Sequence, residues 1–173
     1  MIFQRLPNLP AFRQSATGTL ASGTSSYTIS NARIIRNVGV TVSSNVTYLD
    51  HRVDSYLKDY WPNASTTGQP IMYSTDSATV SGTVITLAPT PNSNYSYEVE
   101  FAAPATGLSS GNTTSWLGAN AENVLLSACL YEASAFLKAP ETVTLYKSQF
   151  DEALQLMQQE MLRDYASEYT GGI

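Results

Sequence analysis

Hydrophobic and polar residues follow two different periods along this chain. Up to about residue 101 the apolar side chains tend to alternate with polar ones, which is the period of a half-buried β-strand. The two best examples are Val38, Val40 and Val42, and then Tyr95, Tyr97, Val99 and Phe101, between which lie Ser96, Glu98 and Glu100. We predict strands there, each with one face toward a core and the other toward water.

Shorter β signals surround these two strands. Segments 17–21 and 27–29 flank a turn at Ser22-Gly23, and segment 46–49 follows the valine strand as a possible hairpin partner. Residues 71–74 and 85–88 are further candidates, and Ser81-Gly82 resembles a two-residue hairpin turn. The first two-thirds of the chain is therefore predicted to be rich in antiparallel β-structure.

One helix is predicted inside this β region, at residues 50–61. Val53, Tyr56, Leu57 and Tyr60 recur at helical spacing, and Pro62 ends the pattern. Asp50 is the expected N-cap, because its carboxylate can accept free amide hydrogens of the first turn.

Helical periodicity takes over after residue 121. Segment 121–138 is apolar almost all round, which predicts a helix buried on most sides, in a bundle or at a subunit contact. Pro140 suits the first turn of a second helix. That helix has one apolar stripe, made by Val143, Tyr146, Phe150, Leu154, Met157 and Met161, and the pattern fades from Tyr165 onward.

Together these elements predict an α+β fold: an antiparallel β-sheet or sandwich module with one inserted helix, followed by a C-terminal helical hairpin. We divide the chain into an N-terminal arm (1–14), a β-rich module (15–104), a linker (105–120), a helical module (121–166) and a tail (167–173).

Charge is distributed unevenly. The chain has 173 residues and a formal net charge of −5. Residues 1–119 carry equal numbers of acidic and basic groups, whereas the remainder has only Lys138, Lys147 and Arg163 against Glu122, Glu132, Glu141, Asp151, Glu152, Glu160, Asp164 and Glu168. An acidic last third cannot neutralise phosphates, so ordinary nucleic-acid binding is not expected.

Candidate catalytic groups are few. The one cysteine, Cys129, is expected in the helical core, and the one histidine, His51, is expected on the surface of the inserted helix. A pairing of His51 with Asp50 or Asp54 to activate Ser43 or Ser44 is conceivable, but no nucleophile motif accompanies them. Glu98 and Glu100 lie on one strand face, where solvated residues are the ordinary interpretation.

Metal, cofactor and membrane functions find no support in the sequence. Asp50, Asp54, Asp59 and Asp76 do not have the spacing of a calcium loop, and no glycine-rich phosphate loop is present. No apolar run is long enough to span a membrane, and the N-terminus lacks the features of a secretory signal. We expect no enzymatic activity, no cofactor, no metal and no membrane contact.

Several segments, in this order, give the chain a resemblance to a known family: Tyr48-Leu49 with the helix that follows, Gly68–Tyr73, Ile85–Pro91, Tyr95–Phe101, Leu108-Ser109 with Thr114–Leu117, and Leu125–Lys138 with Tyr146–Met157. Their order and spacing resemble the head-to-tail adaptor proteins (head-completion or tail-tubular connectors) of tailed bacteriophages. The resemblance covers about residues 38–163.

This resemblance implies a structural virion protein at the head–tail interface, assembled in the host cytoplasm, that binds rather than catalyses. A ring of twelve copies would dock on the portal protein and join the capsid vertex to the tail nozzle or tube, while genomic DNA passes through without specific binding. Portal contact would involve the helical part and the C-terminal tail, namely Arg163, Asp164, Tyr165, Ser167, Glu168, Tyr169 and Ile173.

One departure from the family concerns the N-terminus. Family members generally open with a pair of helices, whereas Pro7 and Pro10 prevent a long helix here. Either those helices are absent or the chain starts late, so that segment 121–138 would need cover from a neighbouring subunit or from the portal.

Two further hypotheses remain open. Asp151, Glu152 and Glu160 could line the DNA channel, where like charge would keep phosphates from sticking. Alternatively, the β-rich region could be a carbohydrate- or receptor-binding module of a phage tail, although this leaves the C-terminal helices unexplained.

Overall fold

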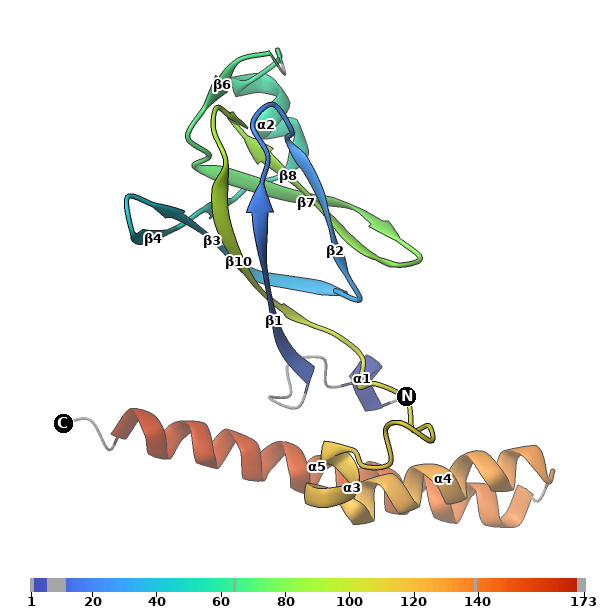
Figure 1. Ribbon diagram of the computed structural model, residues 1–173. Helices are drawn as coiled ribbons and strands as arrows, with labels where there is room; N and C mark the ends of the chain where they lie inside the picture. Colours follow the sequence, from blue (N-terminus) through green and yellow to red (C-terminus); the bar gives the residue numbers. More distant parts are fainter. Residues whose placement is uncertain (1, 6–11, 64, 139, 171–173) are drawn as a thin grey trace. The chain divides into compact units, whose positions relative to one another are not determined.

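The computed structural model describes residues 2–5, 12–63, 65–138 and 140–170, and it divides the chain into two compact units. The β unit comprises Leu6–Pro104, and the helical unit comprises Met1–Arg5 together with Ala105–Ile173. The β unit is thus inserted in the chain between the first helix and the remaining ones (Figure 1). The predicted α+β class is confirmed.

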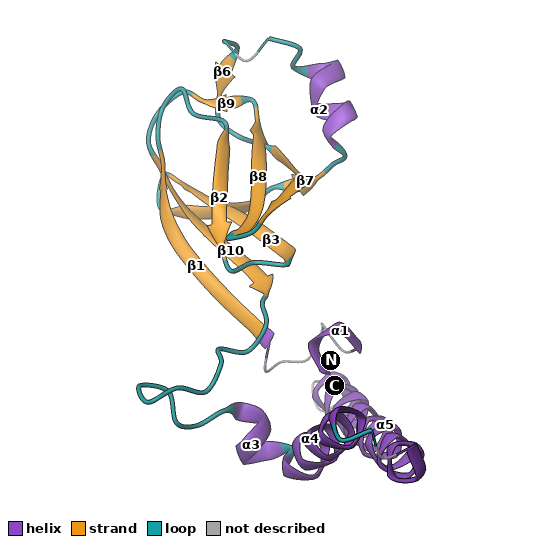
Figure 2. Cartoon of the chain, turned by 90° about the vertical axis from the view of Figure 1, so that its right-hand side faces the viewer, coloured by secondary structure: helices purple, strands orange, loops and turns teal. Residues whose placement is uncertain are grey.

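Two four-stranded sheets form the β unit (Figure 2). The first has the order β1-β10-β3-β4 and is antiparallel throughout; its strands are β1 (Arg13–Leu20), β10 (Tyr95–Ala102), β3 (Ile34–Val42) and β4 (Asn45–Tyr48). The second has the order β2-β8-β7-β5, and its strands are β2 (Ser26–Ser30), β8 (Gly82–Ala88), β7 (Met72–Thr79) and β5 (Asp50–His51).

Two short parallel pairs depart from the predicted antiparallel arrangement. Strand β5 pairs in parallel with β7, and β6 (Thr67–Gly68) pairs in parallel with β9 (Thr90–Pro91). Each pair involves only two residues per strand, so local alternation in the sequence contains no signal for it.

Both sheets contribute to one apolar core. The cluster contains Leu20, Val38, Val40, Val99 and Phe101 from the first sheet, and Ile29, Tyr73, Ile85 and Leu87 from the second. All nine are at most 4% exposed. Burying each such side chain contributes about 1.5–3 kcal/mol relative to leaving it in water, so this core is the main source of stability of the β unit.

The alternation predicted for β10 is confirmed. Val99 and Phe101 face the core, whereas Ser96, Glu98 and Glu100 are exposed on the opposite face. The hairpin of β3 and β4 is confirmed as well, with a turn at Ser43 and Ser44, both of which have positive φ angles.

The turn between β7 and β8 lies one residue earlier than predicted. Thr79 pairs with Gly82, so the turn residues are Val80 and Ser81, and Gly82 opens β8. A Cβ atom on residue 82 would lie 2.0 Å from the backbone oxygen of Ile29. Glycine is therefore required at this position because β2 approaches β8 so closely, and not because of the turn.

The inserted helix is shorter than predicted. Asp50 and His51 belong to β5, so Asp50 is not an N-cap; α2 covers Asp54–Tyr60 and has Val53 at its N-cap position with no side-chain cap. Of the four residues predicted to share an apolar face, only Leu57 is buried. Val53 and Tyr60 are exposed, and Tyr60 stacks on Tyr56 with ring centroids 4.5 Å apart.

The helical unit contains α1 (Ile2–Arg5), α3 (Trp116–Asn120), α4 (Glu122–Phe136) and α5 (Pro140–Thr170). Helix α3 lies inside the predicted linker, where Ser115 caps it by accepting a hydrogen bond from Gly118 N at 3.0 Å. Helix α5 continues to Thr170, past Tyr165, where the apolar pattern in the sequence ends.

Candidate interaction surface

Helices α4 and α5 pack against each other as the predicted hairpin. On α5, Phe150, Leu154 and Met157 are buried, and Val143, Tyr146 and Met161 are half-buried, so the predicted apolar stripe is confirmed. On α4, the buried residues are Val124, Ala128 and Ser134. Because the buried positions occupy one side of each helix, the opposite side of each is left without cover from the described part of this chain.

The uncovered side of α4 is apolar. Leu126, Cys129, Ala133 and Phe136 are all exposed, and their spacing of three, four and three residues places them on one line along the helix. We call these four residues the α4 stripe. Leu126 is 56% exposed and Phe136 is 86% exposed.

This surface corrects one expectation from the sequence, because Cys129 is exposed rather than part of the core. Segment 121–138 is not buried on most sides within one copy, so of the two predicted alternatives the contact with another subunit stays a prediction. Apolar composition alone does not distinguish burial inside a chain from burial against another chain, which explains the error at Cys129.

The N-terminal helix contacts the hairpin. Ile2 is buried, and the guanidinium carbon of Arg5 lies 5.2 Å from the centroid of the Phe150 ring. Arg5 also forms an ion pair with Asp151. These partners are separated by 146 residues in the sequence, so no local pattern could have predicted the contact.

The three acidic channel candidates differ in their surroundings. Asp151 is half-buried and paired with Arg5, whereas Glu152 and Glu160 are exposed on α5. Pairing with a guanidinium offsets the charge of Asp151, so Glu152 and Glu160 contribute more of the net negative charge at the surface of α5.

Most of the portal candidates lie at the end of α5. Arg163 is exposed. Asp164, Tyr165, Ser167, Glu168 and Tyr169 belong to the helix, but their side chains are outside the described part of the structure. Ile173 lies outside the described residues.

His51 has a structural environment rather than a catalytic one. Its Nε2 atom is 3.2 Å from Oγ1 of Thr75, and its ring centroid lies 5.0 Å from that of Tyr73. Neighbouring Asp50 pairs with Arg52, and Asp54 pairs with Lys58. Among the described residues neither carboxylate is hydrogen-bonded to His51, so the His–Asp pair has no support in the geometry.

The remaining polar candidates fit ordinary surface roles. Glu98 is exposed, and Glu100 accepts a hydrogen bond from Nδ2 of Asn37 at 2.9 Å. Within the described ranges, no three His, Cys, Asp or Glu side chains gather closely enough to hold a metal ion. Burial raises the pKa of Tyr73 above the ordinary value, so this phenol stays neutral inside the core.

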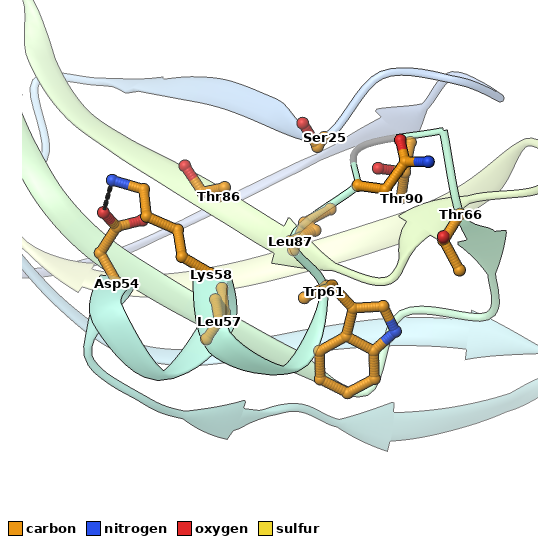
Figure 3. A pocket seen from close by; sticks show the side chains of 11 residues that line it. Ser25, Asp54, Leu57, Lys58, Trp61, Thr66, Thr86, Leu87 and Thr90 are labelled. Atoms are coloured by element: carbon orange, nitrogen blue, oxygen red, sulfur yellow. Dashed lines mark ion pairs between the residues drawn. The ribbon is translucent and has the colours of Figure 1, made fainter.

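A small cavity of about 120 Å³ lies beside α2 in the β unit (Figure 3). Trp61 follows the end of α2, and the other lining groups include the hydroxyls of Ser25, Thr66, Thr86 and Thr90. The ion pair of Asp54 and Lys58 lies in the same lining. The sequence contains no signal for this cavity, because a lone tryptophan next to a proline, as at Trp61, has no local pattern that indicates one.

The described helices include none with the length and apolarity needed to cross a lipid bilayer. A bare apolar stripe on a helix is typical of a protein that functions by assembling with other chains.

Comparison with known families agrees with that class. The family model of the SU10 adaptor protein matches residues 2–171, so the chain belongs to this family of phage adaptor proteins. No curated protein gives a significant match. The resemblance stated from the sequence is therefore confirmed at the level of the family.

Proposed function

We propose that the protein docks as a ring on the portal and connects the capsid vertex to the tail, so that its copies surround part of the DNA channel. The observation that carries this proposal is the α4 stripe. In a single copy it leaves large apolar side chains in water, and contiguous apolar surface of this kind generally marks a contact with another protein. The partners that we propose are neighbouring copies and the portal, and membership of a phage adaptor family supports contact with other virion proteins.

The proposed portal contact lies at the C-terminal end of α5 and in the residues after it. The proposed residues are Arg163, Asp164, Tyr165, Ser167, Glu168, Tyr169 and Ile173. Helix α5 has 31 residues and α4 has 15, so α5 extends well past the length that α4 can cover. An end that α4 does not cover suits insertion into another protein.

The channel role is proposed for Asp151, Glu152 and Glu160, of which Asp151 has its charge offset by the ion pair with Arg5. Like charge on a channel wall would prevent DNA phosphates from binding during passage. No catalytic step, cofactor or metal takes part in this function.

The test is reconstitution with portal rings. We expect purified protein to form a stoichiometric complex with portal rings that electron microscopy shows as an added ring of density. Absence of a complex, with an intact fold shown by circular dichroism, would contradict the proposal.

Deletion of residues 164–173 provides the matched variant. It removes the proposed portal contact and leaves the buried residues of the hairpin in place, so the variant should fold but bind portal rings at least tenfold more weakly. Unchanged affinity for portal rings would exclude the C-terminal end as the portal contact. The reconstitution experiment would then still decide whether the protein forms a ring on the portal.

The β-rich receptor-binding alternative is favoured by one observation only, the hydroxyl-lined cavity beside Trp61. Aromatic rings and neutral hydroxyls are suitable for sugars, and binding on a glycan array would support this function. The adaptor proposal accounts for both units and is preferred.

A further inference from the structure

The α4 stripe has a pattern of sizes that reads the same from either end. Leu126 and Phe136 are large and lie about 15 Å apart along the helix, while Cys129 and Ala133 between them are small. Together with Glu122, the exposed positions are spaced by four, three, four and three residues. This 3.5-residue period is the one that two helices need to pack side by side.

A palindromic pattern fits a second copy of itself in antiparallel orientation. When two α4 helices are centred on residue 131, Leu126 faces Phe136 of the second copy, and Cys129 faces Ala133. Large residues then fill the two ends and small residues allow close approach in the middle. Each contact occurs twice, as a two-fold axis requires.

Charge at the ends of the helix supports the same orientation. Helix α4 contains Glu122 and Glu132 and no basic residue, whereas exposed Lys138 lies two residues beyond its last residue, Phe136. Antiparallel pairing brings Glu122 at the start of one helix close to Lys138 of the second copy. A parallel pairing would instead place Glu122 beside Glu122 and Lys138 beside Lys138.

The flanks of the stripe differ from each other. On one flank lies Leu130, which an antiparallel pair centred on residue 131 would bring close to Leu130 of the second copy. On the other flank lies Glu132, which would approach its own equivalent. The pairing therefore gains apolar contact on one flank and carries one unfavourable charge contact on the other.

We propose that the free protein forms an antiparallel two-fold dimer through the α4 stripe. This goes beyond the adaptor function, because a two-fold contact closes on itself and cannot extend into a ring. The dimer is a form of the unassembled protein that covers the stripe and opens before docking. One helix pair of this length buries less than a standard stable interface, so the association is weak and depends on concentration.

The natural cysteine allows a direct test. Cys129 of one copy lies opposite residue 133 of the other, within the reach of a disulfide, whereas two Cys129 residues are displaced along the helix axes by about 6 Å. We therefore mix the natural protein with the double variant Cys129→Ala/Ala133→Cys under mild oxidation.

The expected product is a disulfide-linked mixed dimer, with little crosslinking in either protein alone. Equal crosslinking in all three samples, or none in the mixture, would overturn the proposal. Crosslinks between Cys129 and a cysteine introduced at residue 152 of α5, running as a ladder of oligomers, would show head-to-tail packing instead and would overturn it as well.

Sedimentation equilibrium provides the second test. Phe136→Ser should raise the dimer dissociation constant at least tenfold, whereas Leu145→Ser, an equally simple change at an exposed leucine of α5, should leave it unchanged. Glu132→Gln should lower the constant severalfold, since it removes the unfavourable charge contact. A natural protein that stays monomeric at millimolar concentration, or equal effects of the two serine variants, would contradict the proposal.

Failure of this inference is separable from failure of the proposed function. Portal binding by a protein that never dimerises would overturn the dimer and leave the adaptor function standing. A dimer that portal rings cannot open would overturn the adaptor function and leave the dimer standing.

Discussion

The β unit and the helical unit differ in how completely each covers its own apolar residues. In the β unit, residues from both sheets meet in one core, and Ile85, Val38 and Val99 are fully buried. In the helical unit, Phe150 is fully buried but Phe136 remains 86% exposed. The β unit therefore has the properties of a self-sufficient scaffold, whereas the helical unit has those of a part that is completed by other chains.

The difference follows from geometry. Two sheets packed face to face bury one side of every strand and leave the polar side in water. Two helices can cover only one side of each other, so a helix with apolar residues on both sides needs a further neighbour. Apolar residues lie on both sides of α4, which indicates assembly with other chains. The outer face of β10 is polar and gives no such indication.

Phe150→Ala should have the largest effect on stability. The change removes the ring that packs beneath Arg5 and should cost about 3–5 kcal/mol, which is large for a unit with so small a core. We expect far-ultraviolet circular dichroism to lose most of the helical signal while the β unit keeps its own unfolding transition. A single cooperative transition of the whole chain would show that the two units do not fold separately.

Ile85→Ala tests the other side of the comparison. Residue 85 lies at the centre of the β core, so we expect a loss of about 2–5 kcal/mol in the free energy of unfolding of the β unit, measured with urea. Val80→Ala, at the fully exposed turn between β7 and β8, is the control and should change stability by less than about 0.5 kcal/mol. Similar losses in both variants would contradict the assigned core.

Tyr73→Phe should have the smallest effect, confined to alkaline pH. Burial raises the pKa of Tyr73 in the folded state, so above about pH 10 the unfolded chain ionises while the folded one does not. The contribution of neutral Tyr73 to the stability of the folded state is therefore fully present below about pH 10, and it is lost as the pH rises above that value. The phenylalanine variant should lose less stability than the natural protein in this range, as measured by urea unfolding at several pH values.

The elements that the sequence predicted well are those with a long, regular local period. Strand β10 and the α5 stripe each repeat their pattern over at least three apolar positions, and each was placed correctly. The adaptor family was also recognised from ordered segments and then confirmed by a match over residues 2–171.

The errors concern contacts between distant residues. Asp50 looked like a helix cap because nothing local indicates that residues 50–51 pair with β7. Arg5 gave no sign that it pairs with Asp151 on the last helix. Cys129 looked like a core residue because the sequence shows that a position is apolar but does not show which chain covers it.

The register of β1 with β10 has a consequence for how such chains can be built. Arg13, where β1 begins, is the direct partner of Ala102, where β10 ends, so the chain enters and leaves the sandwich about 5 Å apart. A module whose two ends are adjacent can be cut out and replaced by a short bridge, or exchanged for another module of the same kind, with no change in the path of the remaining polypeptide. The part of the gene encoding the sandwich is in this sense an interchangeable cassette, and recombination could swap it while the helices that flank it stay in frame and in place.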